Sequence, residues 1–202
     1  MNYFTPAWHS GELDDEVVEK SIRDYKRHLA RLLPSLPPEV QRLATRISLH
    51  DGLLWEALVD RGQARLRLTL RCGDLQVGYF DLELEYAGVS FSLGAIEALR
   101  RLSAARLHRP WLPYFGEALY DEVDAEDGLI VHRILFLRYN RVQAQARRRL
   151  FRQERQRIRQ RKRRILSRGN TYQPLTVQFE QLQIRTTPRA SRYDKEMQTI
   201  QL

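Results

Sequence analysis

The sequence "ARLRLTLRCGDLQVGYFDLELEY", residues 64–86, contains two runs in which apolar and charged residues alternate. In the first run, leucines at every second position share one side of an extended chain and arginines share the other. In the second run, a similar apolar spacing alternates with aspartate and glutamate. Because Gly73-Asp74 supplies a turn between the runs, the stretch predicts an antiparallel hairpin with one buried face.

The polar face of this hairpin is predicted to pair opposite charges across the two strands. The residues predicted to face one another are Arg65, Arg67 and Arg71 in the first strand and Asp81, Glu83 and Glu85 in the second. Exposed pairs of this kind contribute only about 0 to 1 kcal/mol each, so single substitutions are predicted to be mild. The apolar spacing shifts at Gly78, which predicts a β-bulge there.

Helical spacing and period-two spacing elsewhere in the chain predict the remaining elements. Helices are predicted at 13–33, in a shorter segment after the prolines of LPSLPPEV, and at 94–105. Further strands are predicted at 53–62, 117–123, 129–138 and 174–185, with Asp127-Gly128 as a hairpin turn.

Together these elements predict an α+β fold. N-terminal helices are expected to pack on a mostly antiparallel sheet of about six strands, with a long basic helical insertion before the last strand. A single α+β domain is predicted to comprise residues 1–137 and 171–186, and residues 138–170 form the Arg-rich helical insertion. Residues 187–202 are predicted to form a polar C-terminal tail.

The positive charge of the chain is concentrated in the insertion. The 202 residues carry a net charge of +9, and residues 138–168 hold fourteen Arg or Lys and one Glu, a local charge of +13. The remainder therefore carries −4. Cys72 is the single cysteine, which excludes an intramolecular disulfide, and no apolar stretch reaches the roughly twenty residues of a membrane-spanning helix. Because the N-terminus lacks a signal-peptide pattern, we predict a cytoplasmic protein without membrane contact.

The insertion contains the stretch RRRLFRQERQRIRQRKRR, residues 147–164. Between Leu129 and Arg168 there is no Gly or Pro, which predicts a long helix that ends near Gly169. Apolar residues recur along one side of it only every seven positions, so this helix cannot be a core helix.

Arginine is suited to bidentate contacts with phosphate and carboxylate groups. The residues predicted to bind a nucleic acid or another anion are Arg148, Arg152, Arg155, Arg159 and Arg163. The face of this helix is nearly uniform in charge and shows no aromatic interleaving for base stacking, which fits a solvated or partner-bound helix equally well. Any recognition of a nucleic acid is expected to be of the phosphate backbone, with little sequence specificity. An acidic protein surface also fits this charge, and a helix that is only solvated is the remaining alternative. The leading hypothesis is a non-enzymatic binding protein with an anionic partner.

The step His50-Asp51-Gly52 could supply a base together with a residue that orients it. A hydrolase-like enzyme that uses His50 and Asp51 is the third functional hypothesis, although Asp-Gly after a helix is also ordinary turn chemistry. His132, or an acid from 121 to 127, could meet His50 in the fold. Because metal-ligand spacing, a nucleophile elbow and a glycine-rich phosphate loop are all missing, we predict no catalytic residue, metal site or cofactor.

Two short segments, NYFTPAW at residues 2–8 and SLHDG at residues 48–52, carry a family resemblance. They resemble a bacterial family of unknown function with an N-terminal Y-F-T…W signature and a Leu-His-Asp motif before a β-meander. The resemblance covers roughly residues 2–137 and a closing strand near 174–185. The matching residues are Tyr3, Phe4, Thr5, Trp8, His50 and Asp51.

The resemblance implies no known reaction for these residues. The pattern is also similar to small immunity-type proteins that bind a toxin partner through one sheet face. An immunity-type or adaptor domain with a peripheral basic helix is therefore the second functional hypothesis. Residues 138–168 depart from the family pattern, in which only a hairpin loop is expected.

Overall fold

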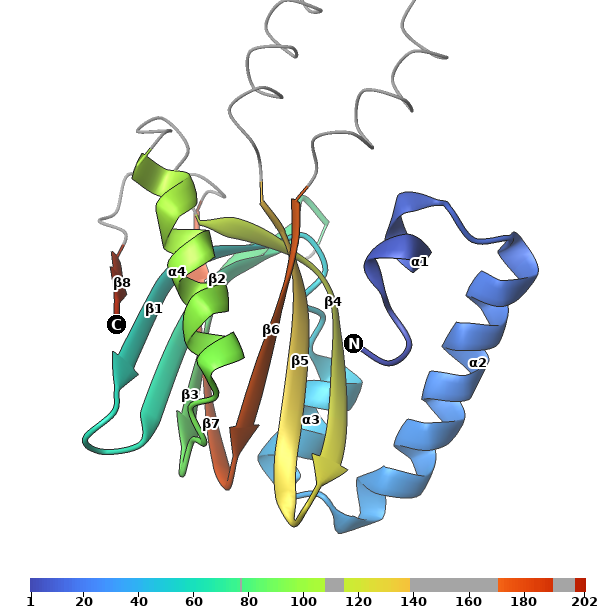
Figure 1. The fold of residues 1–202 in the computed structure, drawn as a ribbon, viewed down its shortest axis with the longest axis horizontal. Coiled ribbons are helices and arrows are strands. Elements are labelled where there is room, and N and C mark those ends of the chain that lie inside the picture. The colour runs from blue at the N-terminus through green and yellow to red at the C-terminus, as the bar shows by residue number, and fades with distance from the viewer. Residues whose placement is uncertain (77, 108–114, 139–170, 191–198) are drawn as a thin grey trace, which may run out of the picture.

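The computed structural model describes residues 1–76, 78–107, 115–138, 171–190 and 199–202. Its helices are α1 (Pro6–Ser10), α2 (Asp15–Leu32), α3 (Pro38–Arg46) and α4 (Leu93–Leu107), with a short 3-10 helix at Leu33–Ser35. Its strands are β1 (Gly52–Asp60), β2 (Arg65–Asp74), β3 (Gly78–Ala87), β4 (Gly116–Glu126), β5 (Leu129–Arg138), β6 (Thr171–Phe179), β7 (Gln181–Arg189) and β8 (Thr199–Gln201). Helices and one antiparallel sheet confirm the predicted α+β class (Figure 1). From residue 139 onward the predicted helical insertion lies outside the described residues.

Seven strands pair antiparallel in the order β6-β5-β4-β1-β2-β3-β7. The predicted number of about six is too low, because the single strand predicted at 174–185 is two strands divided at Glu180. The shift in apolar spacing between Phe179 and Leu182 marks this division. The expected polar tail also contributes to the sheet, since β7 extends to Arg189 and β8 pairs in parallel with β1.

The two ends of this strand order lie next to each other. Only Glu180 separates β6 from β7, although β6 pairs with β5 and β7 pairs with β3. The Glu180 amide donates to the carbonyl of Ala87 (3.0 Å), and the Ser90 amide donates to the carbonyl of Gln178 (2.9 Å). Gly88 has a φ of +66°, and a Cβ there would lie 2.7 Å from the Glu180 side chain, so this junction requires glycine. The sheet therefore curls around its own apolar face.

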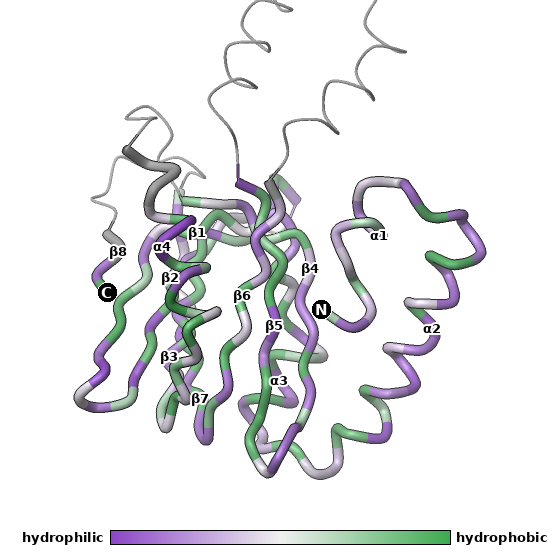
Figure 2. The backbone as a smooth tube through the Cα atoms, viewed as in Figure 1, coloured by the Kyte–Doolittle hydropathy of each residue, from purple (hydrophilic) through white to green (hydrophobic). Residues whose placement is uncertain are grey.

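Two helices complete the core inside the curled sheet. Apolar and polar residues alternate along the strands, as the sequence predicts (Figure 2). Val40 and Leu43 of α3 and Leu99 and Leu102 of α4 are fully buried. By contrast, α2 has no buried residue and lies on the opposite side of the sheet from α4 in Figure 1. Within the described residues, no helix combines the length and the apolar character that crossing a membrane requires.

The predicted hairpin is confirmed as the antiparallel pair of β2 and β3. Its charged rows face each other as predicted, and Arg67 aligns with Glu85 and Arg71 with Asp81. The bulge predicted at Gly78 is wrong, because the register of β2 with β3 is continuous. Register shifts occur instead in β1 and in β4. The apolar spacing changes near Gly78 because the hairpin turn itself separates the two apolar runs.

The charge pairing extends across four strands on the outer face of the sheet. Arg67 of β2 lies 3.4 Å from Glu56 of β1 and 4.0 Å from Glu83 of β3. Arg185 of β7 lies 3.4 Å from Glu83. Acid and base therefore alternate from β1 to β7, which favours the observed register and leaves little unpaired charge in this row.

One pair of the predicted charge rows is buried. The Arg71 side chain is 1% exposed, and its Nε and Nη2 donate to the two carboxylate oxygens of Asp81 at 2.8 and 3.3 Å. Its guanidinium lies 4.2 Å from the centre of the Trp55 ring, and Arg189 donates to Asp81 as well, at 2.5 Å. The premise that all these pairs are exposed is therefore wrong for Arg71, because Trp55 at the β1 bulge covers its guanidinium.

Buried Glu122 of β4 holds the N-terminal segment against the sheet. Its carboxylate accepts hydrogen bonds of 2.7 Å from the backbone amides of residues 2, 3 and 4. Three charge-assisted hydrogen bonds offset the cost of burying this carboxylate. Thr5 then caps α1 by accepting a hydrogen bond from the Trp8 amide (3.3 Å). The residues of the Y-F-T…W signature thus have a structural role in attaching α1 to the sheet.

Candidate functional site

Five predicted anion-binding residues lie outside the described part of the chain: Arg148, Arg152, Arg155, Arg159 and Arg163. The described chain leaves the sheet at Arg138, the last residue of β5, and returns at Thr171, the first residue of β6. These two residues are partners at one end of the β5–β6 ladder. The Arg-rich segment therefore begins and ends at one place on the sheet, and the described residues around that place can be analysed.

Two arginines meet at this place. Arg138 is half-buried, and its Nε is buried without a hydrogen-bond partner in the described structure. Burial and the neighbouring Arg101 of α4 lower the pKa of Arg138, although a guanidinium stays charged at neutral pH. Arg101 itself donates to Glu97 at 2.8 Å. Because Arg138 and Arg101 are neighbouring cations and Glu97 pairs with Arg101, the junction of α4 with β5 favours an additional anion.

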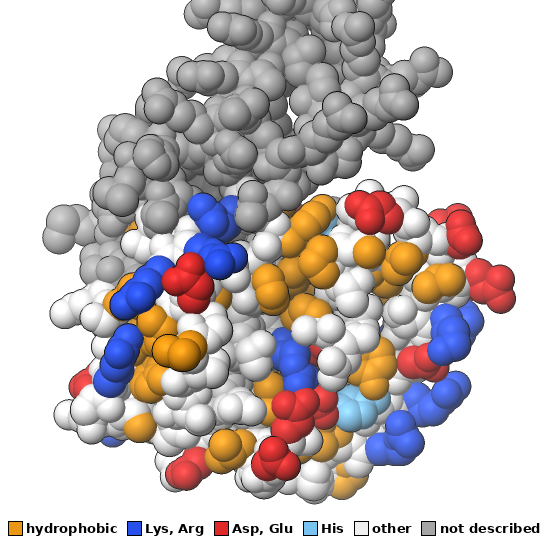
Figure 3. Space-filling model, viewed as in Figure 1, with side chains coloured by type: hydrophobic (Ala, Val, Ile, Leu, Met, Phe, Trp, Pro, Cys, Tyr) orange, Lys and Arg blue, Asp and Glu red, His pale blue; other side chains and the backbone are white. Residues whose placement is uncertain are grey.

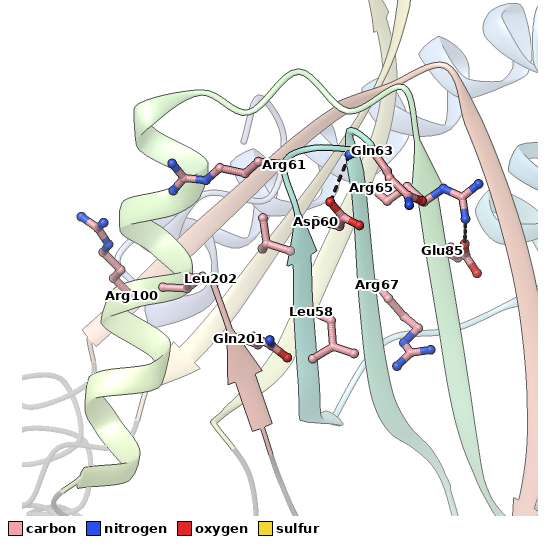
Figure 4. A pocket seen from close by; sticks show the side chains of 11 residues that line it. Leu58, Asp60, Arg61, Gln63, Arg65, Arg67, Glu85, Arg100, Gln201 and Leu202 are labelled. Carbon is pink, nitrogen blue, oxygen red and sulfur yellow. Dashed lines mark hydrogen bonds and ion pairs between the residues drawn. The ribbon is translucent and has the colours of Figure 1, made fainter.

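The helix α4 extends the positive charge from this junction toward a groove. Arg100 and Arg101 are both exposed, and basic side chains gather over α4 in Figure 3, whereas α2 carries acids and bases interspersed. Arg100 lines an open groove of about 810 Å³ beside the β1–β2 turn, which we call the β1–β2 groove (Figure 4). The other charged residues that line it are Arg61, Arg65, Arg67, Asp60 and Glu85.

The arginines of the groove differ in whether they have an acid partner. Arg65 lies 3.3 Å from Glu85, and Arg67 is paired with Glu56. In the described structure, Arg61 and Arg100 make no hydrogen bond and no ion pair (Figure 4). Sequence reasoning missed both residues because they lie far from the Arg-rich segment. The Arg100-Arg101 pair inside a helical pattern was the available signal.

His50 and Asp51 lie in the turn between α3 and β1. The Nδ1 of His50 is 3.3 Å from Oδ2 of Asp51, and both side chains are about half exposed. The His50 ring packs edge-on against Tyr120 of β4, with 5.2 Å between ring centroids. His9 of α1 packs against the same tyrosine at 5.7 Å. The fold thus brings His9 to His50, a juxtaposition that depends on the attachment of the N-terminal segment to Glu122.

The ionisation of this cluster is set by burial and by neighbouring charge. Burial and the positive charge of His50 lower the pKa of His9, while Asp51 and Glu117 act in the opposite direction. Burial and Asp51 raise the pKa of Tyr120, so its hydroxyl stays protonated. Ring contacts rather than hydrogen bonds join both histidines to Tyr120. In the part of the chain that the structure describes, no three His, Cys, Asp or Glu side chains are placed to hold a metal ion.

His132 does not join His50 but lies in the core. Its Nδ1 is 2.8 Å from the hydroxyl of Tyr86, and its Nε2 is 3.1 Å from Asp121. Burial raises the pKa of Tyr86 well above its ordinary value, so its hydroxyl stays protonated beside Nδ1 of His132. Tyr86 and His132 are fully buried, so this chain of hydrogen bonds links β3 to β5 and cannot contact a substrate.

Replacing His50 with asparagine is expected to raise the pKa of His9, because it removes a positive charge that lowers it. The folded-state pKa of His9 lies below its ordinary value of 6.5, so stability is expected to fall as pH decreases from 6.5 through that folded-state value. His50→Asn should weaken this dependence. Titration of the His9 ring protons by NMR measures the shift.

His28→Asn serves as the control, because His28 contacts Asp124 and is not among the groups that shift His9. His50→Ala and Asp51→Ala are both expected to change stability modestly and to leave anion binding unchanged. A hydrolytic or metal-dependent activity that His50→Ala abolishes in a folded protein would instead favour the enzyme hypothesis.

Comparisons with protein-family models, with curated proteins and with solved structures gave no match to this chain. The resemblance carried by residues 2–8 and 48–52 therefore stays a prediction. Function has to be argued from the charge, geometry and burial of the residues themselves.

Proposed function

We propose that this chain is a non-enzymatic binding protein whose Arg-rich segment, residues 138–170, engages an anionic partner. The observation that carries the proposal is the charge of residues 138–168, which hold fourteen basic residues and one acid. Like charges at this density repel one another, and a partner with several negative groups relieves that repulsion. A nucleic acid backbone and an acidic protein surface both meet this requirement.

The described residues next to the segment support the same proposal. Arg138 and Arg101 are neighbours, and Glu97 is the acid that pairs with Arg101. A buried Nε of Arg138 has no partner in the described structure. An anion bound along the segment could therefore be contacted by Arg138 at the point where the segment joins the sheet.

The two other hypotheses receive less support from the geometry. An immunity-type or adaptor domain would use a sheet face, but the charges of Glu56, Arg67, Glu83 and Arg185 on the outer face already pair with one another. An enzyme at His50 and Asp51 would need a group for the base to activate. In the described structure, the neighbours of His50 include the Asp51 carboxylate at 3.3 Å and the ring of Tyr120, whose hydroxyl stays protonated.

Binding to a nucleic acid duplex is expected to depend steeply on salt. If the five predicted arginines each neutralise one phosphate, the log–log slope of affinity against salt is about −4.5, which is roughly a 500-fold loss between 50 and 200 mM NaCl. Fluorescence anisotropy of the full chain with a labelled 20-base-pair duplex measures this slope. Two unrelated duplex sequences should bind within about threefold, since phosphate contacts carry no sequence information.

A labelled glutamate-rich peptide, titrated under the same conditions, separates the two kinds of partner. Binding to the peptide alone would assign an acidic protein surface. Absence of binding to both probes at 50 mM NaCl would contradict the proposal.

A further inference from the structure

The β1–β2 groove combines positive charge with open access. Arg61 lies in the β1–β2 turn and Arg100 lies on α4, so two separate elements contribute guanidinium groups that make no hydrogen bond or ion pair in the described structure (Figure 4). A hydrogen bond from the arginine that follows Arg100 on α4 lowers the pKa of the Glu97 carboxyl, and the charge of Arg100 acts in the same direction. Arg61 and Arg100 are both exposed. Leu58 and Val59 of β1 are half-buried and also line the groove. The lining of the groove thus combines arginine side chains with the apolar side chains of Leu58 and Val59.

We propose that the β1–β2 groove binds the phosphodiester backbone of a nucleic acid, with Arg61 and Arg100 each contacting a phosphate. This inference rests on the proposed function and extends it to a second contact surface outside the Arg-rich segment. Guanidinium groups suit such contacts because their donors match the oxygens of a phosphate. Arg65 forms an ion pair with Glu85, and Arg67 forms one with Glu56. These two arginines therefore shape the groove and add less uncompensated positive charge to it.

The composition of the groove favours a nucleic acid over an acidic protein. Protein–protein interfaces depend on buried aromatic or apolar anchors and are depleted in charge at their centres. Nucleic acid interfaces are more polar and more positively charged. The groove is lined by four arginines and two acids, Asp60 and Glu85, which leaves an excess of positive charge, and by no aromatic side chain. The absence of an aromatic ring from this lining also favours contact with the backbone rather than stacking on bases.

The groove and the Arg-rich segment can serve one ligand because α4 connects them. Arg100 faces the groove, and the next residue, Arg101, lies beside Arg138 where the segment joins β5. Basic side chains over this helix are visible in Figure 3. One helix therefore carries basic side chains both to the groove and to the place where the segment joins the sheet.

The double variant Arg61→Glu with Arg100→Glu tests this inference in the full chain. Anisotropy with the labelled 20-base-pair duplex, repeated between 50 and 200 mM NaCl, gives the salt slope. Loss of two phosphate contacts is expected to reduce the magnitude of the slope by about 1.8 and the affinity at 100 mM by roughly 10- to 100-fold. Thermal melting should change little, because both side chains are exposed.

Lys26→Glu with Arg31→Glu is the matched control. Both residues are exposed on α2, on the opposite side of the sheet, and the double change alters the net charge by the same amount. The control is expected to retain the wild-type slope. If the groove variant behaves like the control, the groove inference is overturned while the proposed function stands. If wild type fails to bind the duplex at 50 mM, the groove inference is overturned, and the proposed function is overturned with it when the glutamate-rich peptide also fails to bind. If a glutamate-rich peptide competes as well as unlabelled duplex, the assignment of the groove to nucleic acid is wrong.

Discussion

Replacement of Arg148, Arg152, Arg155 and Arg159 with glutamate is expected to abolish binding to the 20-base-pair duplex at 100 mM NaCl. The four changes lower the net charge of the chain by 8, from +9 to +1, and all of this change falls within one segment. Four lost phosphate contacts correspond to a slope change of about 3.6, or on the order of a thousandfold in affinity at 100 mM. Repulsion from the four new carboxylates adds to this loss.

The same variant is expected to melt within about 2 °C of wild type. The buried apolar residues described by the structure come from the sheet, from α3 and α4, and from short connecting segments. The sequence of the Arg-rich segment has few apolar residues, which predicts that it adds few core contacts. Circular dichroism during heating measures the melting temperature. A large decrease would indicate that the segment contributes to the core and would contradict its assignment as a binding element.

Lysine at the same four positions provides the control for charge. It keeps the net charge and removes the planar guanidinium, so the salt slope should be retained and the affinity should fall by about tenfold or less. Duplex binding that survives reversal to glutamate would show that the contacts lie elsewhere on the chain. A lysine variant as weak as the glutamate variant would show that bidentate geometry matters more than charge.

The two hairpins were predictable because their determinants are local. Alternating apolar and charged residues define the inner and outer faces of β2 and β3 without reference to the rest of the chain. The turn between β4 and β5 was predicted from Asp127-Gly128, and both residues have positive φ, 51° and 79°. Opposite charge rows then favour the register that the structure shows.

The curl of the sheet was not predictable in the same way. The shift in apolar spacing around Glu180 signalled a break in the last strand, but no local pattern states that β6 pairs with β5 while β7 pairs with β3. Partner choice depends on contacts between residues far apart in the sequence, such as Tyr86 with His132. The spacing of residues along the sequence does not predict such contacts.

The same difference between local and distant contacts decided which candidate sites could be predicted from the sequence. The Arg-rich segment is visible in the sequence because its charge is continuous. The β1–β2 groove depends on Arg61 and Arg100, which the fold brings together from a turn and a helix. His9 and His50 likewise meet at Tyr120 only because Glu122 attaches the N-terminal segment to β4.

Replacement of Asp81 with alanine is expected to lower the free energy of unfolding by about 3 to 5 kcal/mol. The carboxylate accepts two hydrogen bonds from Arg71, whose side chain is only 1% exposed. Removal of one member of a buried ion pair leaves the other charge desolvated, and that cost exceeds the loss of the contact itself. Urea unfolding followed by tryptophan fluorescence, to which Trp55 beside the Arg71 guanidinium contributes, measures the change.

Two comparison variants separate burial from charge pairing as the cause. Glu85→Ala removes the partner of Arg65 at the surface and should cost about 0 to 1 kcal/mol. Arg71→Met combined with Asp81→Leu removes both buried charges and fills a similar volume, so most of the stability lost in Asp81→Ala should return. An Asp81→Ala loss no greater than that of Glu85→Ala would mean that water reaches Arg71 once its partner is removed. The buried pair Arg71–Asp81 would then contribute no more to stability than the exposed pairs of the same charge row.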